Sequence, residues 1–170
     1  MLKVDLGRLG REGSILLEAQ VSAEDNLWKD SGITWCGPVD FGLRASFAGS
    51  GEVVVRGRVQ GPLQQECRRC VQSLENKLDE ELTLVYLSAE TEAESEEAGA
   101  YLFEPIAGEL DLSYAVREEV MLAINQYVVC DPKCSGLCPR CGTNLNQATC
   151  DCRQDESDPR WEALRSLKDR

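Results

Sequence analysis

Alternating apolar and polar positions run through the first half of the chain. Every second side chain between residues 39 and 47 is apolar, which is the period of a strand with one buried face. Between residues 52 and 60, three valines fall on one face of such a strand and two arginines on the other. A third alternating run spans residues 78–86. Glycine-rich turns separate the runs, so the pattern predicts an antiparallel meander over about residues 14–87.

Two later segments have the period of amphipathic helices. The first is capped by Asp111 or Ser113 and continues to about Asn125, and we expect it to pack on the sheet. Its apolar positions are Leu112, Val116, Val120, Ala123 and Ile124. The second begins at Asp158 and Pro159 and places Trp161, Leu164 and Leu167 on one side. We expect this short helix to dock on its own domain, with docking on a partner as the alternative.

Charge is distributed unevenly along the chain. Eighteen Lys and Arg stand against 30 Asp and Glu, and the whole excess of 12 negative charges lies in residues 1–129. Five glutamates and no large apolar side chain predict a disordered, solvated acidic loop at residues 88–100. An acidic body repels phosphate groups. The charge therefore disfavours broad nucleic-acid binding, DNA included, and either suits a basic protein partner or serves solubility.

Several classes of function are excluded by what the sequence lacks. The 170 residues contain no histidine, which removes His-dependent nucleophilic catalysis and His-ligated metals. No apolar run approaches the roughly 18 residues that cross a bilayer, and the first residues do not resemble a signal peptide. We therefore expect a cytoplasmic protein with no membrane contact. In that reducing compartment, nine cysteines favour metal binding over disulfides.

Six cysteines lie within the 23 residues from 130 to 152. Pro139 and Gly142 predict a tight loop around two of them, as in metal-binding knuckles. The first predicted zinc site comprises Cys138, Cys141, Cys150 and Cys152. Four thiolates complete a tetrahedral shell and leave no position for a reactive water, so this zinc would be structural. Disulfides, an iron–sulfur cluster and free thiols are the alternatives.

Apart from these four and Cys36, the remaining four cysteines form two pairs that could share a second site. These are Cys67 and Cys70, at a turn between two predicted strands, and Cys130 and Cys134, just after the predicted helix. Joined by a second zinc ion, they would tie together segments about 60 residues apart. Otherwise Cys67 and Cys70 are an ordinary turn pair or a redox dithiol activated by neighbouring arginines. A zinc store or sensor is a further alternative, and Cys36 is expected to be buried as a small hydrophobe.

Several blocks of sequence, in order and spacing, resemble the YceD family of large ribosomal RNA subunit accumulation proteins. The blocks are Cys67-Arg68-Arg69-Cys70-Val71, Leu110-Asp111-Leu112, the run from Cys130 to Asn146, Cys150-Asp151-Cys152, and Asp158-Pro159-Arg160-Trp161 with Leu164 and Leu167. The resemblance implies a bacterial-type cytoplasmic factor, also found in plastids. Such a factor is needed for normal processing or accumulation of 23S ribosomal RNA, with no established enzymatic activity and no catalytic residues.

The sequence therefore predicts an α+β protein with no enzymatic role. Residues 1–129 are expected to form an antiparallel sheet, open or barrel-like, with a covering helix and the acidic loop at 88–100. Residues 130–170 are expected to form a Cys-rich zinc-knuckle lobe and the C-terminal helix. The expected partners are ribosomal proteins or rRNA-processing factors, with the 23S rRNA precursor as a further candidate. RNA contacts, if direct, are assigned to Lys133, Arg140 and Arg153.

Overall fold

A computed structural model of the chain describes residues 2–49, 51–88, 100–104 and 108–152. Its main feature is a curved sheet of six strands in which β2, β4, β5, β6 and β7 are neighbours in that order and β3 pairs with β5. The strands are β2 (Ser14–Val21), β3 (Thr34–Trp35), β4 (Val39–Phe47), β5 (Val53–Glu66), β6 (Ser73–Ser88) and β7 (Ala100–Phe103). Two short strands, β1 (Lys3–Asp5) and β8 (Glu109–Asp111), pair separately.

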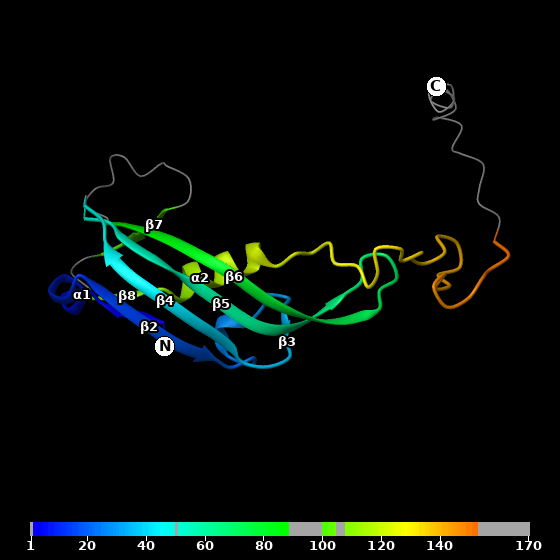
Figure 1. Ribbon diagram of the computed structural model, residues 1–170, viewed down its shortest axis with the longest axis horizontal. Coiled ribbons are helices and arrows are strands. Elements are labelled where there is room, and N and C mark those ends of the chain that lie inside the picture. Colours follow the sequence, from blue (N-terminus) through cyan, green and yellow to red (C-terminus); the bar gives the residue numbers. More distant parts are fainter. Residues whose placement is uncertain (1, 50, 89–99, 105–107, 153–170) are drawn as a thin grey trace, which may run out of the picture.

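Helices cover one face of this sheet, as Figure 1 shows for α2. They are α1 (Leu6–Glu12), α2 (Ser113–Ala123) and the single 3-10 turn η1 (Asn26–Trp28). The inward side chains of the sheet and the apolar side of α2 form one core. Its fully buried members include Leu43, Val55, Leu84, Val116 and Val120. The sheet and helix therefore fold as one hydrophobic unit, as the period of the sequence indicates.

The predicted strands and covering helix are confirmed, with shifted ends. Inward positions of β4 alternate with exposed ones, as do those of β5 and β6. Strand β5 continues beyond the predicted residue 60 to Glu66, where its pairing with β6 ends. Trp35 of β3 packs over Gly61, where a Cβ would lie 3.0 Å from its ring. Helix α2 ends at Ala123 instead of Asn125. The residue at its N-cap is Leu112, so neither Asp111 nor Ser113 caps the helix as predicted. The Asp111 carboxylate accepts a hydrogen bond from the Ser113 amide at the start of the helix.

The predicted sheet needs two corrections. It is mixed and not wholly antiparallel, because β7 runs parallel to β6, with Val85 opposite Ala100. It is also not closed into a barrel: β2 and β7 form opposite edges and do not pair with each other among the described residues. The inward face of the sheet is covered instead by α2, whose Val116 and Val120 belong to the same core.

Parts of two predictions lie outside the described residues. These are the acidic loop, apart from its ends in β6 and β7, and the C-terminal helix from Asp158. The division of the chain at residues 129 and 130 stays a prediction. No helix within the described ranges has both the length and the apolar character needed to cross a membrane.

Candidate metal centres

The β5–β6 hairpin extends past the rest of the sheet and ends in a turn at residues 67–72, which we call the hairpin tip. After α2, the chain runs back to this tip, as the yellow segment in Figure 1 shows. The Arg68 amide donates to the carbonyl of Val128, at 2.9 Å, and the Leu137 amide donates to the carbonyl of Arg69, at 3.0 Å. Two stretches far apart in sequence are thus joined by backbone hydrogen bonds on either side of the cysteines.

The second site predicted from the sequence lies nearer the sheet, and from here on we call its four cysteines the first group. These are Cys67, Cys70, Cys130 and Cys134, whose four sulfurs all lie within 4.8 Å of one another. The Sγ atoms of Cys67 and Cys134 are 3.8 Å apart, and those of Cys70 and Cys130 are 3.6 Å apart. Both distances far exceed the roughly 2.05 Å of a disulfide. Four thiolates around one zinc ion, each about 2.3 Å from the metal, lie about 3.8 Å from each other. The group therefore has the dimensions of a single tetrahedral site.

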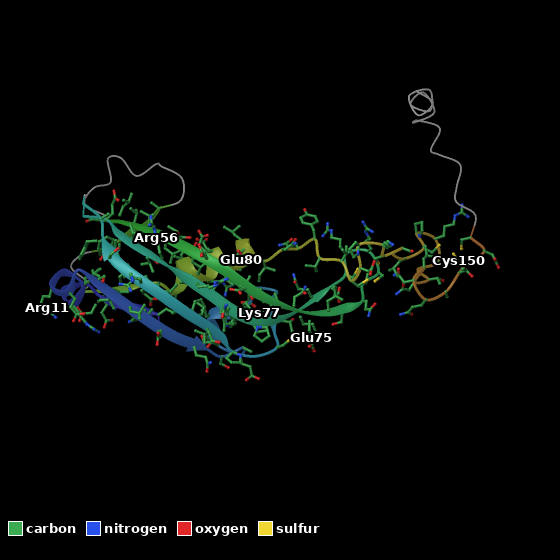
Figure 2. The ribbon with its side chains drawn as sticks, in the orientation of Figure 1. Arg11, Arg56, Glu75, Lys77, Glu80 and Cys150 are labelled. Carbon is green, nitrogen blue, oxygen red and sulfur yellow. The ribbon has the colours of Figure 1, made fainter. Side chains whose placement is uncertain are left out.

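Cys138, Cys141, Cys150 and Cys152 form the second group, again with all sulfurs within 4.8 Å of one another. Figure 2 shows it around the labelled Cys150, farther from the sheet than the hairpin tip. Cys138 is buried, whereas Cys141 is exposed. The structure thus brings together both sets of four cysteines that the sequence spacing suggested, the second set at one end of the described chain.

One cysteine pair in each group lies on the same kind of backbone turn. In the hairpin tip, the Cys67 amide donates to the Gln72 carbonyl and the Val71 amide to the Cys67 carbonyl. In the second group, the Cys138 amide donates to the Thr143 carbonyl and the Gly142 amide to the Cys138 carbonyl. The spacing of donors and acceptors is identical. Both turns direct the amides that follow the first cysteine toward its sulfur, which favours the thiolate needed for binding metal.

The thiols of the first group have divided acidities. Burial alone would raise the pKa of Cys67, but amides of Cys130, Cys70 and Arg69 donate to its sulfur and lower the pKa to about 6. Burial also opposes ionisation of Cys134, whose pKa is nevertheless lowered, chiefly because the Asn146 amide donates to its sulfur at 3.2 Å. The neighbouring Cys134 sulfur raises the pKa of Cys130 to about 12.

The second group repeats this division. Amides of Cys141 and Arg140 lower the pKa of Cys138, and the Thr143 hydroxyl and amide lower that of Cys141 to about 6. The neighbouring Cys141 sulfur raises the pKa of Cys152 to about 12. In each group, two sulfurs ionise readily and thereby oppose ionisation of the other two. A divalent cation placed among them would remove this repulsion and allow all four to bind as thiolates.

Three positioning residues of the first group were not identified from the sequence. The Arg69 guanidinium donates to the carbonyls of Pro132, at 3.2 Å, and Cys134, at 3.0 Å, and so holds the second pair against the tip. Asn146 donates to the Cys134 sulfur and accepts from the Ser135 amide. Gly136 has φ +74°, and a Cβ there would lie 3.0 Å from the Arg69 carbonyl oxygen. The sequence indicated Arg69 only as a neighbour that could activate the thiols, and nothing in it indicated the contacts of Asn146.

The two equivalent turns differ at the position after their second cysteine. This residue has positive φ in both: +58° at Val71 and +74° at Gly142. A left-handed conformation costs an L-residue roughly 1–2 kcal/mol, whereas glycine adopts it readily. We expect Gly142→Val to lower the free energy of unfolding by about 1–2 kcal/mol and Val71→Gly to leave it unchanged or raise it slightly. Denaturant titration of the full chain measures both, and a loss at Val71→Gly as large as that at Gly142→Val would contradict the assignment of strain.

The remaining residues that the sequence singled out are Cys36, the basic side chains assigned to RNA contacts and the candidate redox pair. Cys36 is exposed, so the prediction that it is buried was wrong: the strand alternation turns Trp35 inward and its neighbour outward. Lys133 and Arg140 are exposed on the cysteine-rich segment, and Arg153 lies outside the described residues. Cys67 and Cys70, the candidate redox pair, are only 1% and 5% exposed.

The chain is similar to one protein family and to several individual proteins. The family model described as large ribosomal RNA subunit accumulation protein YceD matches residues 55–168. A chloroplast protein of Arabidopsis thaliana described as YCED homolog 1 is 39% identical over 67 residues, which are 39% of this chain and 21% of that protein. An uncharacterized protein of Mycobacterium tuberculosis is 30% identical over an alignment of 175 residues, covering 96% of this chain and 79% of the relative. The chain thus spans about a fifth of the chloroplast relative's length. No solved structure matches.

Proposed function

The chain belongs to the YceD family of large ribosomal RNA subunit accumulation proteins, and from that membership we propose that it supports the processing or accumulation of 23S ribosomal RNA during large-subunit assembly. The observation that carries this proposal is the extent of the family match. It runs from residue 55 to residue 168 and so includes both four-cysteine groups together with the hairpin tip. The region shared with the family is therefore the region in which the candidate metal centres are built.

Zinc is the metal that this set of sulfurs suits best. Four soft thiolates at the spacing of a tetrahedron favour zinc over magnesium or calcium, which bind oxygen. Cys67, Cys70, Cys130 and Cys134 would hold one ion, and Cys138, Cys141, Cys150 and Cys152 a second. An iron–sulfur cluster would have to accommodate several irons and sulfides among the same four side chains, whose sulfurs are already at single-ion distances. When bound, zinc supplies a stable cross-link and no reactive ligand.

A non-catalytic role follows from this chemistry. Four protein thiolates occupy every position of a tetrahedral ion, so no water can be activated there. The chain has no histidine to act as a base in catalysis. A redox exchange at Cys67 and Cys70 would require another thiol to reach sulfurs that are almost fully buried, which makes this alternative weaker. A zinc store would require rapid release, which the first group disfavours because three of its four cysteines are buried.

We assign separate roles to the two parts of the chain in this function. Residues 1–129 provide the sheet and its covering helix, and residues 130–170 provide the cysteine-rich lobe, whose first site fixes it to the hairpin tip. The partners would be ribosomal proteins or rRNA-processing factors in the cytoplasm, with the 23S precursor contacted through basic residues of the lobe. Lys133, Arg140 and Arg153 are the candidates named by the sequence.

The cellular role is tested by deleting the gene and measuring the ratio of mature large-subunit to small-subunit ribosomal RNA. We expect the ratio to fall on deletion and to be restored by the wild-type gene and by Cys36→Ser, whose cysteine is exposed and belongs to neither group. A double variant, Cys67→Ser with Cys70→Ser, is expected not to restore it. An unchanged ratio after deletion would refute the proposed function.

A further inference from the structure

The surface of the hairpin tip carries an unusual set of exposed side chains. Tyr127 is 73% exposed, Val71 is 53% exposed and Val129 is 36% exposed. Val71 and Val129 directly neighbour cysteines of the first group in the sequence. The Val128 carbonyl that accepts from the Arg68 amide places this part of the chain directly against the tip. We call the set formed by Arg68, Val71, Tyr127 and Val129 the tip surface. Within this set, Arg68 and Tyr127 are in direct contact, and these two residues carry the argument for a binding surface.

Basic side chains outnumber acidic ones in this region, whereas acidic side chains outnumber basic ones in the chain as a whole. The turn at 67–72 and the segment 126–152 together contain four basic and two acidic side chains, whereas the whole chain has 18 basic and 30 acidic. A basic protein would be attracted to the acidic sheet and not to this end of the molecule. Each site of four thiolates and one zinc ion would add a net charge of 2−, so the lobe as a whole would not be positive. The positive charge that a polyanion would meet here is the exposed guanidinium of Arg68, and its contact with an exposed aromatic ring favours an unpaired nucleic acid over a protein for the tip surface.

Arg68 and Tyr127 form the centre of the tip surface. The Arg68 guanidinium carbon lies 4.7 Å from the centroid of the Tyr127 ring, within the range of a cation–π contact. The backbone on both sides is held, since the Arg68 amide donates to Val128 and the Tyr127 amide donates to the Asn125 side chain at 2.8 Å. One face of the ring is covered by the guanidinium, and the high exposure of Tyr127 leaves the other face open to solvent. This is the arrangement on which an unpaired base stacks.

The two adjacent arginines of the tip have different roles. Arg69 directs its guanidinium at two carbonyls, those of Pro132 and Cys134, and therefore acts in holding the lobe together. Arg68 contacts only the exposed aromatic ring among the side-chain interactions found in the described residues. Its charge is at the surface and can meet a phosphate while Tyr127 receives the base.

We propose that the tip surface binds single-stranded RNA, with a base stacked on Tyr127 and the adjoining phosphate against Arg68. This inference rests on the proposed function in ribosomal RNA accumulation and names the contact by which the protein would meet its RNA. The two cysteine groups fix the geometry but do not touch the RNA. Unpaired bases are required because a duplex hides the faces that stack.

The test uses the full-length, metal-loaded chain and a fluorescent single-stranded oligoribonucleotide of mixed sequence, with binding followed by fluorescence anisotropy. We expect Tyr127→Ala to weaken binding about 5- to 150-fold, the range found for loss of one stacked base. Tyr127→Phe keeps the ring and is expected to bind within about twofold of wild type. Tyr114→Ala is the matched control, because Tyr114 is also well exposed, at 66%, but lies on α2.

Arg68→Ala is expected to reduce the dependence of log affinity on log salt by about 0.7.

Metal content measured on each variant shows whether the lobe is intact. Equal affinity of Tyr127→Ala and wild type, or equal losses at Tyr127→Ala and Tyr114→Ala, would overturn the inference. Binding of a matched RNA duplex as tight as that of the single strand would also overturn it.

The cellular assay separates this inference from the proposed function. If gene deletion lowers the large-subunit rRNA ratio but Tyr127→Ala restores it fully, the tip surface is not the RNA contact, while the proposed function stands. If wild-type protein binds no RNA but deletion still lowers the ratio, the inference fails in favour of a protein partner. If deletion has no effect, the proposed function itself fails.

Discussion

Replacing Cys67 by serine is expected to remove one zinc ion per chain and to release the segment 128–137 from the hairpin tip. Cys67 is the most buried sulfur of the first group, at 1% exposure, and three backbone amides donate to it. Without this thiolate, the remaining three sulfurs no longer complete a tetrahedral shell. Metal binding and local folding are coupled, so loss of the ion should open the contacts around it.

Hydrogen exchange at individual amides measures this opening. The Arg68 and Leu137 amides, which bridge the tip and the lobe, are expected to exchange roughly tenfold faster or more in Cys67→Ser, while amides of β4 keep their protection. Cys138→Ser should also lose one ion but leave these two amides protected. Cys36→Ser, outside both groups, should change neither metal content nor exchange. Full metal content and unchanged exchange in Cys67→Ser would show that the first group is not a metal site.

Gly57→Ala is expected to destabilise the sheet strongly. A Cβ at Gly57 would lie 2.0 Å from the Gly42 carbonyl oxygen and 2.7 Å from the Leu43 Cα, both backbone atoms of the neighbouring strand. Strands β4 and β5 would have to separate at the centre of the core. We expect a loss of about 3 kcal/mol or more, or a fall in melting temperature of about 6–12 °C for a loss of that size.

Gly42→Ala is the matched control for this change. Gly42 lies on the adjacent strand, one residue from the partner of Gly57, but a Cβ there would meet nothing within 4 Å. Its replacement is expected to be neutral or slightly stabilising, because alanine loses less backbone entropy on folding. Equal destabilisation by the two substitutions in thermal unfolding would contradict the close approach of the strands at Gly57.

The sequence predicted the parts of the fold whose pattern is long and regular. Strand β4 alternates over nine residues, and its inward positions at Val39, Phe41 and Leu43 are all buried. The short elements were missed because their residues oppose the structure they adopt. Helix α1 contains two glycines, yet it forms because Asp5 accepts from the Arg8 amide and Leu9 is completely buried. Tertiary packing there outweighs helix propensity.

The candidate site was predicted in composition but not in its supporting contacts. Cysteine spacing indicated both groups of four, since closely spaced pairs in short loops can meet around one ion. The contribution of Asn146 to the Cys134 sulfur depends on a loop whose path the sequence does not specify. Parallel pairing of β7 was also not predictable, because its four residues carry no signal of strand direction. Val71 gave no sign of its left-handed backbone, which glycine would have suggested.

We propose that eight cysteines hold two zinc ions and that the first of these two sites fixes the lobe to the hairpin tip. The most direct test is the native mass of the full-length protein, purified without added metal or chelator. The expected mass is that of the chain with two zinc ions. A metal-free chain that still unfolds cooperatively, with the cysteines of both groups all open to alkylation, would contradict the claim.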